Sequence, residues 1–279
     1  MKKEDFDLFA DMVKKRSGLV LTSEKAYLLE SRLMPVARKH NMKDLEELAS
    51  SMRLKRDEKI MEAITEAMTT NETFFFRDQK PFDQFRQVVL PHMLKARAAK
   101  KSLRIWSAAS STGQEAYSLA MILTEEAAKM QGWHIEIIGT DLSQEVVDKA
   151  KHGIYNQFEV QRGLPVTMLV KYFKQIEEKW QISDKIRAMV QYRTMNLLED
   201  WGPIGQFDVI FCRNVLIYFD QPTKAKILDR QSQILAADGA LFLGGAESTL
   251  GICDKFKGVE SQRGIYIPAA CPAELWKAA

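Results

Sequence analysis

The chain has 279 residues, enough for one large or two modest domains. Hydrophobic residues make up 46% and charged residues 28% of it, which is typical of a globular protein and excludes a disordered or membrane-inserted class. The net charge of +3 is nearly balanced and argues against a nucleic-acid partner.

The first seventy residues predict a helical bundle. Apolar residues from Phe6 to Val13 recur at helical spacing and end at Ser17-Gly18, a typical helix stop. Similar patterns predict helices near 23–37, 45–52 and 57–68, with Pro35 as a possible kink, and no strand pattern interrupts them. We therefore assign residues 1–70 to an N-terminal helical domain and 71–102 to a junction. The basic run from Arg86 to Arg104 favours a solvated helix face and turn.

From Leu103 onward the pattern alternates. A buried strand is predicted at 103–108, a helix at 114–129, a second strand at 135–141 and a helix at 143–151, which is the βαβ unit of a doubly wound sheet. Further strands are predicted at 207–212, 240–244 and 264–267. The span 153–195 fits the alternation poorly. We interpret 103–279 as the second domain and about 155–188 as a small insertion.

The loop between the first strand and helix is built from small residues with a single glycine, Gly113. A pyrophosphate-bearing dinucleotide normally requires more glycines, so a smaller ligand, such as the amino-acid portion of S-adenosylmethionine (SAM), fits better. A plain tight turn remains the alternative. Asp141 ends the second strand, where a carboxylate can accept ribose hydroxyls or simply precede a helix cap.

Two later strands also end in polar residues. Asn196-Leu197 is placed to reach an adenine edge, and Arg213-Asn214 lies at a ligand-binding edge, although Asn214 could instead cap a turn and Arg213 could pair with an acid. Three consecutive phenylalanines precede Arg77. They predict either a buried domain anchor or a wall beside a guanidinium that holds a carboxylate.

Four motifs occur in order: TTNETFFFRD (69–78), SAASSTGQEAYSLAM (107–121), GTDLS (139–143) and FDVIFCRNVLIYFD (207–220). Together they resemble the chemotaxis receptor methyltransferases, the CheR family, over nearly the whole chain. The resemblance implies an α/β fold: a doubly wound SAM-dependent methyltransferase sheet, an N-terminal helical domain and a small antiparallel β insertion. It implies an enzyme that uses SAM to form γ-glutamyl methyl esters on chemoreceptors and releases S-adenosylhomocysteine.

The resemblance also assigns residues. Positions matching SAM contacts are Asn71, Thr73, Arg77, Glu115, Asp141, Asn196, Leu197, Arg213 and Asn214. Arg77 and Tyr218 match positions near the transferred methyl and are the catalytic candidates, with a core tyrosine as the alternative for Tyr218. A glutamate side chain is already an anion at neutral pH, with a pKa of about 4.3, so no general base is expected.

The same resemblance implies how a partner is bound. Arg32, Arg38 and Lys39 on the second predicted helix either face an acidic receptor helix or form a solvated face. Segment 174–180 lacks the glycine of family members that bind a receptor tether, so we expect tether-independent docking by a monomer.

Scattered cysteines and histidines predict no metal and a cytoplasmic location. Alternatives are a methyltransferase for another anionic acceptor and a SAM-binding signalling adaptor; the glycine-poor loop argues against a nicotinamide-dependent oxidoreductase.

Overall fold

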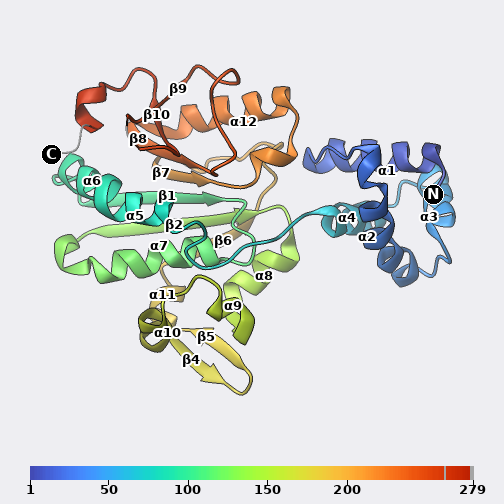
Figure 1. Cartoon of the computed structure of the whole chain (residues 1–279), viewed down its shortest axis with the longest axis horizontal. Helices are drawn as coiled ribbons and strands as arrows, with labels where there is room; N and C mark the ends of the chain where they lie inside the picture. The colour runs from blue at the N-terminus through green and yellow to red at the C-terminus, as the bar shows by residue number, and fades with distance from the viewer. Residues whose placement is uncertain (261, 277–279) are drawn as a thin grey trace.

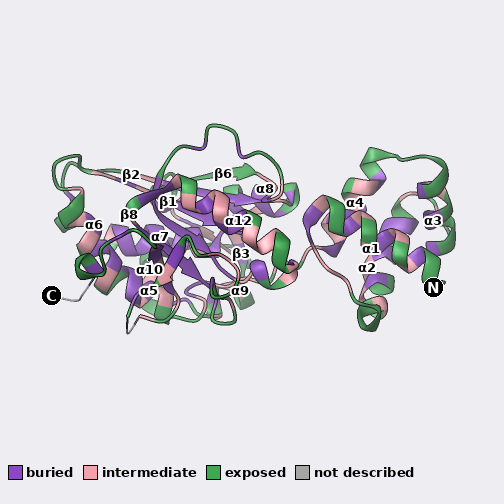
Figure 2. Ribbon diagram, turned by 90° about the horizontal axis from the view of Figure 1, so that it is seen from above, coloured by how far each residue is buried: buried purple, intermediate pink, exposed green. Residues whose placement is uncertain are grey.

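The computed structural model describes residues 1–260 and 262–276. Figure 1 shows a helical part at the N-terminus and a larger α/β part, joined by an extended segment that follows α4. Figure 2 shows buried residues concentrated in the sheet and, separately, in the centre of the helical part. The two parts therefore have their own hydrophobic cores.

Four helices make up the N-terminal part: α1 (Lys3–Ser17), α2 (Ala26–Lys39), α3 (Leu45–Leu54) and α4 (Glu58–Met68). Their apolar faces enclose a core that includes the fully buried side chains Phe9, Leu33 and Ile64. The Asp44 and Asp57 carboxylates accept backbone N–H groups at the starts of α3 and α4, which satisfies donors that a helix leaves unpaired.

A seven-stranded sheet forms the centre of the α/β part, in the order β6-β2-β1-β7-β8-β10-β9. Its strands are β1 (Ser102–Ala108), β2 (His134–Asp141), β6 (Val190–Thr194), β7 (Phe207–Cys212), β8 (Leu235–Leu243), β9 (Phe256–Gly258) and β10 (Ile265–Pro268). The first five in this order are parallel, β10 pairs antiparallel with β8, and β9 pairs antiparallel with β10. The chain winds away from β1 in both directions, so the carboxyl ends of β1 and β7 form the topological switch point where open sheets bind ligands.

Both faces of the sheet are covered. Ile105 and Phe211 point into one core, while their neighbours Trp106 and Ile210 point into the other, as the two-residue period of a strand requires. The covering helices are α5 (Lys80–Gln84), α6 (Leu90–Ala96), α7 (Gln114–Glu125), α8 (Gln144–His152), α11 (Asp184–Arg187) and α12 (Gln221–Ile234). A π-helical turn at Phe85–Val89 joins α5 to α6.

The insertion is a three-stranded antiparallel sheet in the order β3-β5-β4. Its elements are β3 (Ile154–Asn156), α9 (Gln157–Gln161), α10 (Val166–Tyr172), β4 (Phe173–Ile176) and β5 (Lys179–Ile182). Tyr155 and Phe173 pack edge-on against Phe75, with ring centroids 5.0 and 5.4 Å away. The insertion therefore rests on the segment that joins the two parts of the chain.

The structure corrects several sequence-based boundaries. Helix α7 ends at Glu125 and is followed by a separate 3₁₀ turn, and β8 begins five residues before the predicted strand. The solvated face predicted for the basic run is wrong for Arg97, whose guanidinium pairs with Asp208 and Asp238 and is only 14% exposed. Asp238 lies within β8 where the pairing with β7 is irregular, between the pairs Phe207–Leu235 and Val209–Ala240.

Candidate active site

One cleft contains every residue that the sequence assigned to catalysis or SAM binding. It lies at the carboxyl ends of the central strands and reaches the N-terminal helical part at Ser17 and Leu19. The space in it that no atom fills is about 950 Å³, including the part open to solvent. The predicted residues that line it are Asn71, Thr73, Arg77, Glu115, Asp141, Asn196, Leu197, Arg213, Asn214 and Tyr218.

The loop after β1 is held in an unusual conformation. Ala109 and Ser111 have φ angles of 56° and 48°, in the left-handed region that few non-glycine residues adopt. Gly113 has a φ of 96°, and a Cβ there would lie 2.7 Å from the Tyr192 hydroxyl. That hydroxyl donates to the Gly113 carbonyl at 3.1 Å. The loop therefore requires glycine at this position and has a fixed shape beside the cleft.

Asp141 faces this loop from the end of β2. Its carboxylate accepts the backbone N–H of Ser111 at 2.8 Å and that of Ser143 at 3.1 Å. Burial raises the pKa of Asp141, and the hydrogen bonds from the Ser143 and Ser111 amides oppose that shift. Each carboxylate oxygen has a further lone pair, so the group can also accept a ligand hydroxyl.

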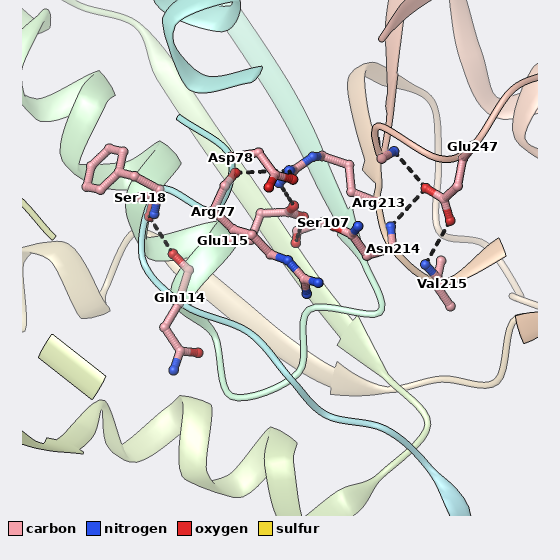
Figure 3. A network of polar contacts seen from close by, with 12 residues as sticks. Arg77, Asp78, Ser107, Gln114, Glu115, Ser118, Arg213, Asn214, Val215 and Glu247 are labelled. Atoms are coloured by element: carbon pink, nitrogen blue, oxygen red, sulfur yellow. Dashed lines mark hydrogen bonds and ion pairs between the residues drawn. The ribbon is translucent and has the colours of Figure 1, made fainter. Parts of the chain in front are cut away.

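Glu115 and Arg213 form a buried ion pair at the floor of the cleft (Figure 3). Arg213 is 1% exposed and donates to Glu115 at 2.9 Å, to Asp78 at 2.7 Å and to the Arg77 carbonyl at 2.9 Å. Burial raises the pKa of Glu115, which the Arg213 guanidinium and the Ser107 hydroxyl oppose. Arg213 thus pairs with acids, one of the alternatives left open by the sequence, and fixes the backbone that carries Arg77.

The aromatic stretch is partly an anchor of the junction and partly a support for the Arg77 side chain. Phe75 and Phe76 are buried in the core, whereas Phe74 is half-buried. The Arg77 guanidinium lies 5.7 Å from the Phe74 ring and donates to the Glu72 carbonyl at 2.6 Å. Two phenylalanines therefore anchor the junction while the third supports a guanidinium that lines the cleft.

Asn196 and Tyr218 connect the cleft to the N-terminal helices. The Asn196 amide donates to the Arg16 carbonyl at 2.7 Å, and its oxygen accepts the Leu198 N–H at 3.0 Å. The Tyr218 carbonyl accepts the Val20 N–H at 2.9 Å, and its side chain is half-buried against the cleft. Contact of Asn196 with an adenine remains a prediction, because its described hydrogen bonds are with protein groups.

The chain matches two family descriptions in sequence order. Residues 4–69 match the all-alpha domain and residues 71–265 the SAM-binding domain of the CheR methyltransferases. The chain belongs to the CheR methyltransferase family. This confirms the family resemblance carried by the four motifs and the fold class expected from it.

Several curated relatives align with this CheR methyltransferase over almost the full length of both proteins. Chemotaxis protein methyltransferase 1 of Pseudomonas aeruginosa is 40% identical over 269 residues, covering 95% of this chain and 97% of that protein. The chemotaxis protein methyltransferase of Vibrio anguillarum is 37% identical over 265 residues, covering 94% and 95%. The similarity thus extends over both parts of the chain.

The basic residues that the family resemblance assigned to a receptor surface lie in different environments. Arg38 and Lys39 are exposed at the end of α2. Arg32 instead donates to the carbonyls of Met68 and Thr69 at 2.8 and 2.9 Å and to the Thr70 hydroxyl at 3.2 Å. Arg32 therefore caps the end of α4 and holds the start of the segment that leads into the cleft.

Four residues that shape the site of this CheR methyltransferase were missed by the sequence reasoning. Tyr192 and Tyr155 donate to carbonyls of the loop after β1, with Tyr155 bonded to Thr112 at 2.8 Å. Arg162 from the insertion lies 4.2 Å from the Phe74 ring, and Glu247 contacts the loop that carries Asn214. Only pairwise spatial information could have identified them, because none belongs to a local motif.

Among residues 1–260 and 262–276, no helix combines the length and the apolar character needed to cross a membrane.

Proposed function

We propose that this CheR methyltransferase transfers a methyl group from SAM to glutamate side chains of chemoreceptors, forming γ-glutamyl methyl esters in the cytoplasm and releasing S-adenosylhomocysteine. The observation that carries the proposal is the meeting of all ten candidate residues in one cleft of a chain that belongs to this family. The names of the relatives, chemotaxis protein methyltransferases, support the class of acceptor.

The side chains of the cleft fit SAM. The Asp141 carboxylate suits a pair of ribose hydroxyls, and the buried Leu197 offers an apolar surface for a base. The strained loop after β1 brings backbone close to the ligand, as an amino-acid moiety requires. When bound, SAM supplies a methyl group on a positively charged sulfur.

Residues of the chain then have to position an acceptor carboxylate. The Arg77 guanidinium can hold the carboxylate by charge-assisted hydrogen bonds, and the Tyr218 hydroxyl can donate to the second oxygen. The free oxygen must lie in line with the methyl carbon at roughly 3–3.5 Å. An O–C bond forms as the C–S bond breaks and its electron pair stays on sulfur, so no proton has to be removed.

Two exposed features of the surface support a proposal for how the receptor docks. Arg38 and Lys39 at the end of α2 provide exposed positive charge for an acidic receptor helix. The turn between β4 and β5 contains Glu177 and Glu178 and no glycine, which supports docking without a receptor tether. We propose that a monomer suffices, because the cleft is lined by residues of one chain.

The decisive experiment incubates the protein with methyl-labelled SAM and receptor-bearing membranes, then treats the product with base. Ester methyl groups leave as volatile methanol, whereas N-methyl groups remain on the protein. We expect volatile label that depends on the receptor. Label that resists base would exclude the glutamate ester, and transfer to acidic proteins other than receptors would favour another anionic acceptor.

A further inference from the structure

Glu247 lies in the turn after β8, outside every motif that carried the family resemblance. Its carboxylate accepts four backbone N–H groups. One oxygen accepts Gly244 at 2.6 Å and Asn214 at 2.8 Å, and the other accepts Val215 at 2.9 Å and Ile217 at 3.2 Å. Figure 3 shows Glu247 beside Asn214 and Val215. A single side chain thus satisfies three donors of the loop after β7 and one donor of its own turn.

That loop, residues 213–219, follows β7 and carries Asn214 and Tyr218 into the cleft. Asn214 has a φ of 59°, so the backbone turns through the left-handed region immediately after the strand. Successive N–H groups that point to one place form an anion-binding concavity, which the Glu247 carboxylate fills. Hydrogen bonds to a charged acceptor are about twice as strong as neutral ones, so this contact largely determines the loop conformation.

The surroundings are fitted closely to this carboxylate. A Cβ on Gly244 would lie 2.7 Å from a Glu247 carboxylate oxygen and 2.9 Å from the Asn214 nitrogen. A side chain at position 244 is therefore incompatible with the contact. On the opposite side of the loop, the Val20 N–H holds the Tyr218 carbonyl at 2.9 Å. Glu247 and Val20 together restrain Tyr218 at both ends of its short turn.

We propose that Glu247 is a positioning residue for methyl transfer. It acts through the loop, by holding Tyr218 and Asn214 at the wall of the cleft that Arg77 also lines. This inference rests on the proposed function, in which Tyr218 contacts the acceptor carboxylate.

The test compares the variant Glu247→Gln with wild type and with Glu274→Gln, which changes an exposed glutamate near the C-terminus. The amide of Gln presents N–H donors to two of the four backbone donors, so the loop must rearrange although the side-chain volume is unchanged. We expect kcat per SAM-binding site to fall at least tenfold and the SAM Kd to rise, with the receptor KM within about twofold. Glu274→Gln should match wild type.

Measuring the number of SAM-binding sites per chain distinguishes a positioning role of Glu247 from a role in folding. A purely structural role would reduce the number of SAM-binding sites per chain and leave kcat per site unchanged, which would overturn the proposal. If Glu247→Gln does not fold, Glu247→Asp provides the test, because it retains the charge with a shorter reach. An unchanged kcat per site in Glu247→Asp would then overturn the proposal. Absence of transfer by the wild-type protein would contradict the proposed function instead.

Discussion

Arg77 combines a fixed backbone with a lightly restrained side chain. Its carbonyl is held by the buried Arg213, while its guanidinium has one protein hydrogen-bond acceptor among residues 1–260 and 262–276, the Glu72 carbonyl. A guanidinium has five N–H donors, so most of them are available to an incoming carboxylate. The residue is thus positioned by its neighbours and retains its capacity to bind an anion.

Replacing Arg77 with Ala should abolish turnover while the fold survives. The guanidinium is half-buried and makes one protein hydrogen bond, so the free energy of unfolding should change by no more than about 1 kcal/mol. Methyl transfer should fall by a factor of at least 100, since a charged contact to the acceptor is lost. Initial rates and thermal unfolding measure both effects. Arg193→Ala, at an exposed arginine on β6, is the control, and near-normal turnover of Arg77→Ala would refute the assigned role.

The sequence alone predicted that the site residues gather at one edge of the sheet where position along a strand determines their location. Asp141 and Arg213 follow buried strands, and parallel strands bring their carboxyl ends to one edge. The sequence could not show that Arg213 pairs with Glu115, 98 residues away, or that Glu247 binds the loop of Asn214, 33 residues away. Such pairings depend on side-chain geometry between elements, which no local pattern encodes.

At the scale of elements, the segment that follows α4 is the most connected part of the site. Its start is held by Arg32 of α2, its Phe76 N–H donates to Ser118 of α7 at 3.0 Å, and its Phe75 packs on the insertion. Phe76, Asp78 and Gln79 all have positive φ angles, between 43° and 67°. Strain of this kind persists only where the surroundings impose it. Three separate elements therefore determine where Arg77 lies.

Arg162 provides the test of this coupling. It donates to the Glu72 carboxylate at 2.7 Å and stacks at 4.2 Å on Phe74, the ring that also supports Arg77. The hydrogen bond from Arg162 lowers the pKa of Glu72, so the pair is fully charged at neutral pH and is lost only as the pH falls below the usual carboxyl range. We expect Arg162→Gln to lower kcat about 3–10-fold, a modest effect because both side chains are 40% or more exposed.

The measurement is kcat at saturating SAM and receptor. Arg187→Gln removes an arginine of α11 that pairs with Asp184 and donates to the His152 carbonyl rather than contacting Phe74 or Glu72, and should leave kcat unchanged. A double variant with Arg77→Lys should show less than the product of the single effects, since both act on the same guanidinium position. If the loss of kcat in the double variant equals the product of the two single losses, the insertion does not act through Arg77.

Helices and strands were predicted accurately where apolar residues recur at regular spacing, and poorly where polar residues lie within a strand. Helix α4 and strand β7 match their predicted spans within a residue or two because their patterns are regular. The first residues of β8 read as a turn, since Asp238 and Gly239 are poor strand formers. The pairing of β7 with β8 is irregular there, because Phe207 pairs with Leu235 and Val209 pairs with Ala240. The local preference thus appears as an irregularity in the ladder, beside the Arg97–Asp238 ion pair.

At the scale of the whole molecule, the cleft is completed by the N-terminal helices. Contacts that join them to the α/β part near the site include Val20 to Tyr218 at 2.9 Å, Lys14 to Asp220 at 2.8 Å, Asn196 to Arg16 at 2.7 Å and Ser143 to Glu66 at 2.6 Å. The Val20 contact involves the loop that carries Tyr218, and the Lys14 contact involves Asp220, the residue immediately after that loop. Placement of the helical part and geometry of the catalytic loop are therefore coupled.

Gly18 tests that coupling because it lies where the two parts meet. Its φ is 78°, and a Cβ there would lie 2.9 Å from Phe219 and 3.0 Å from Leu198. Gly202 has a φ of 59° with no atom within 4 Å of an added Cβ, so Gly202→Ala imposes similar backbone strain without a clash. Both variants should lose about 1–2 kcal/mol of stability from the left-handed backbone.

Only Gly18→Ala should also displace Phe219, and with it the adjacent Tyr218, so we expect its kcat to fall several-fold while that of Gly202→Ala stays at the wild-type value. Steady-state rates and thermal unfolding of the two variants separate the effect of backbone strain from the effect of the domain contact. Backbone strain is common to both variants, whereas only Gly18→Ala disturbs the contact with Phe219. Equal rates in the two variants would mean that the helical part can shift without disturbing the catalytic loop.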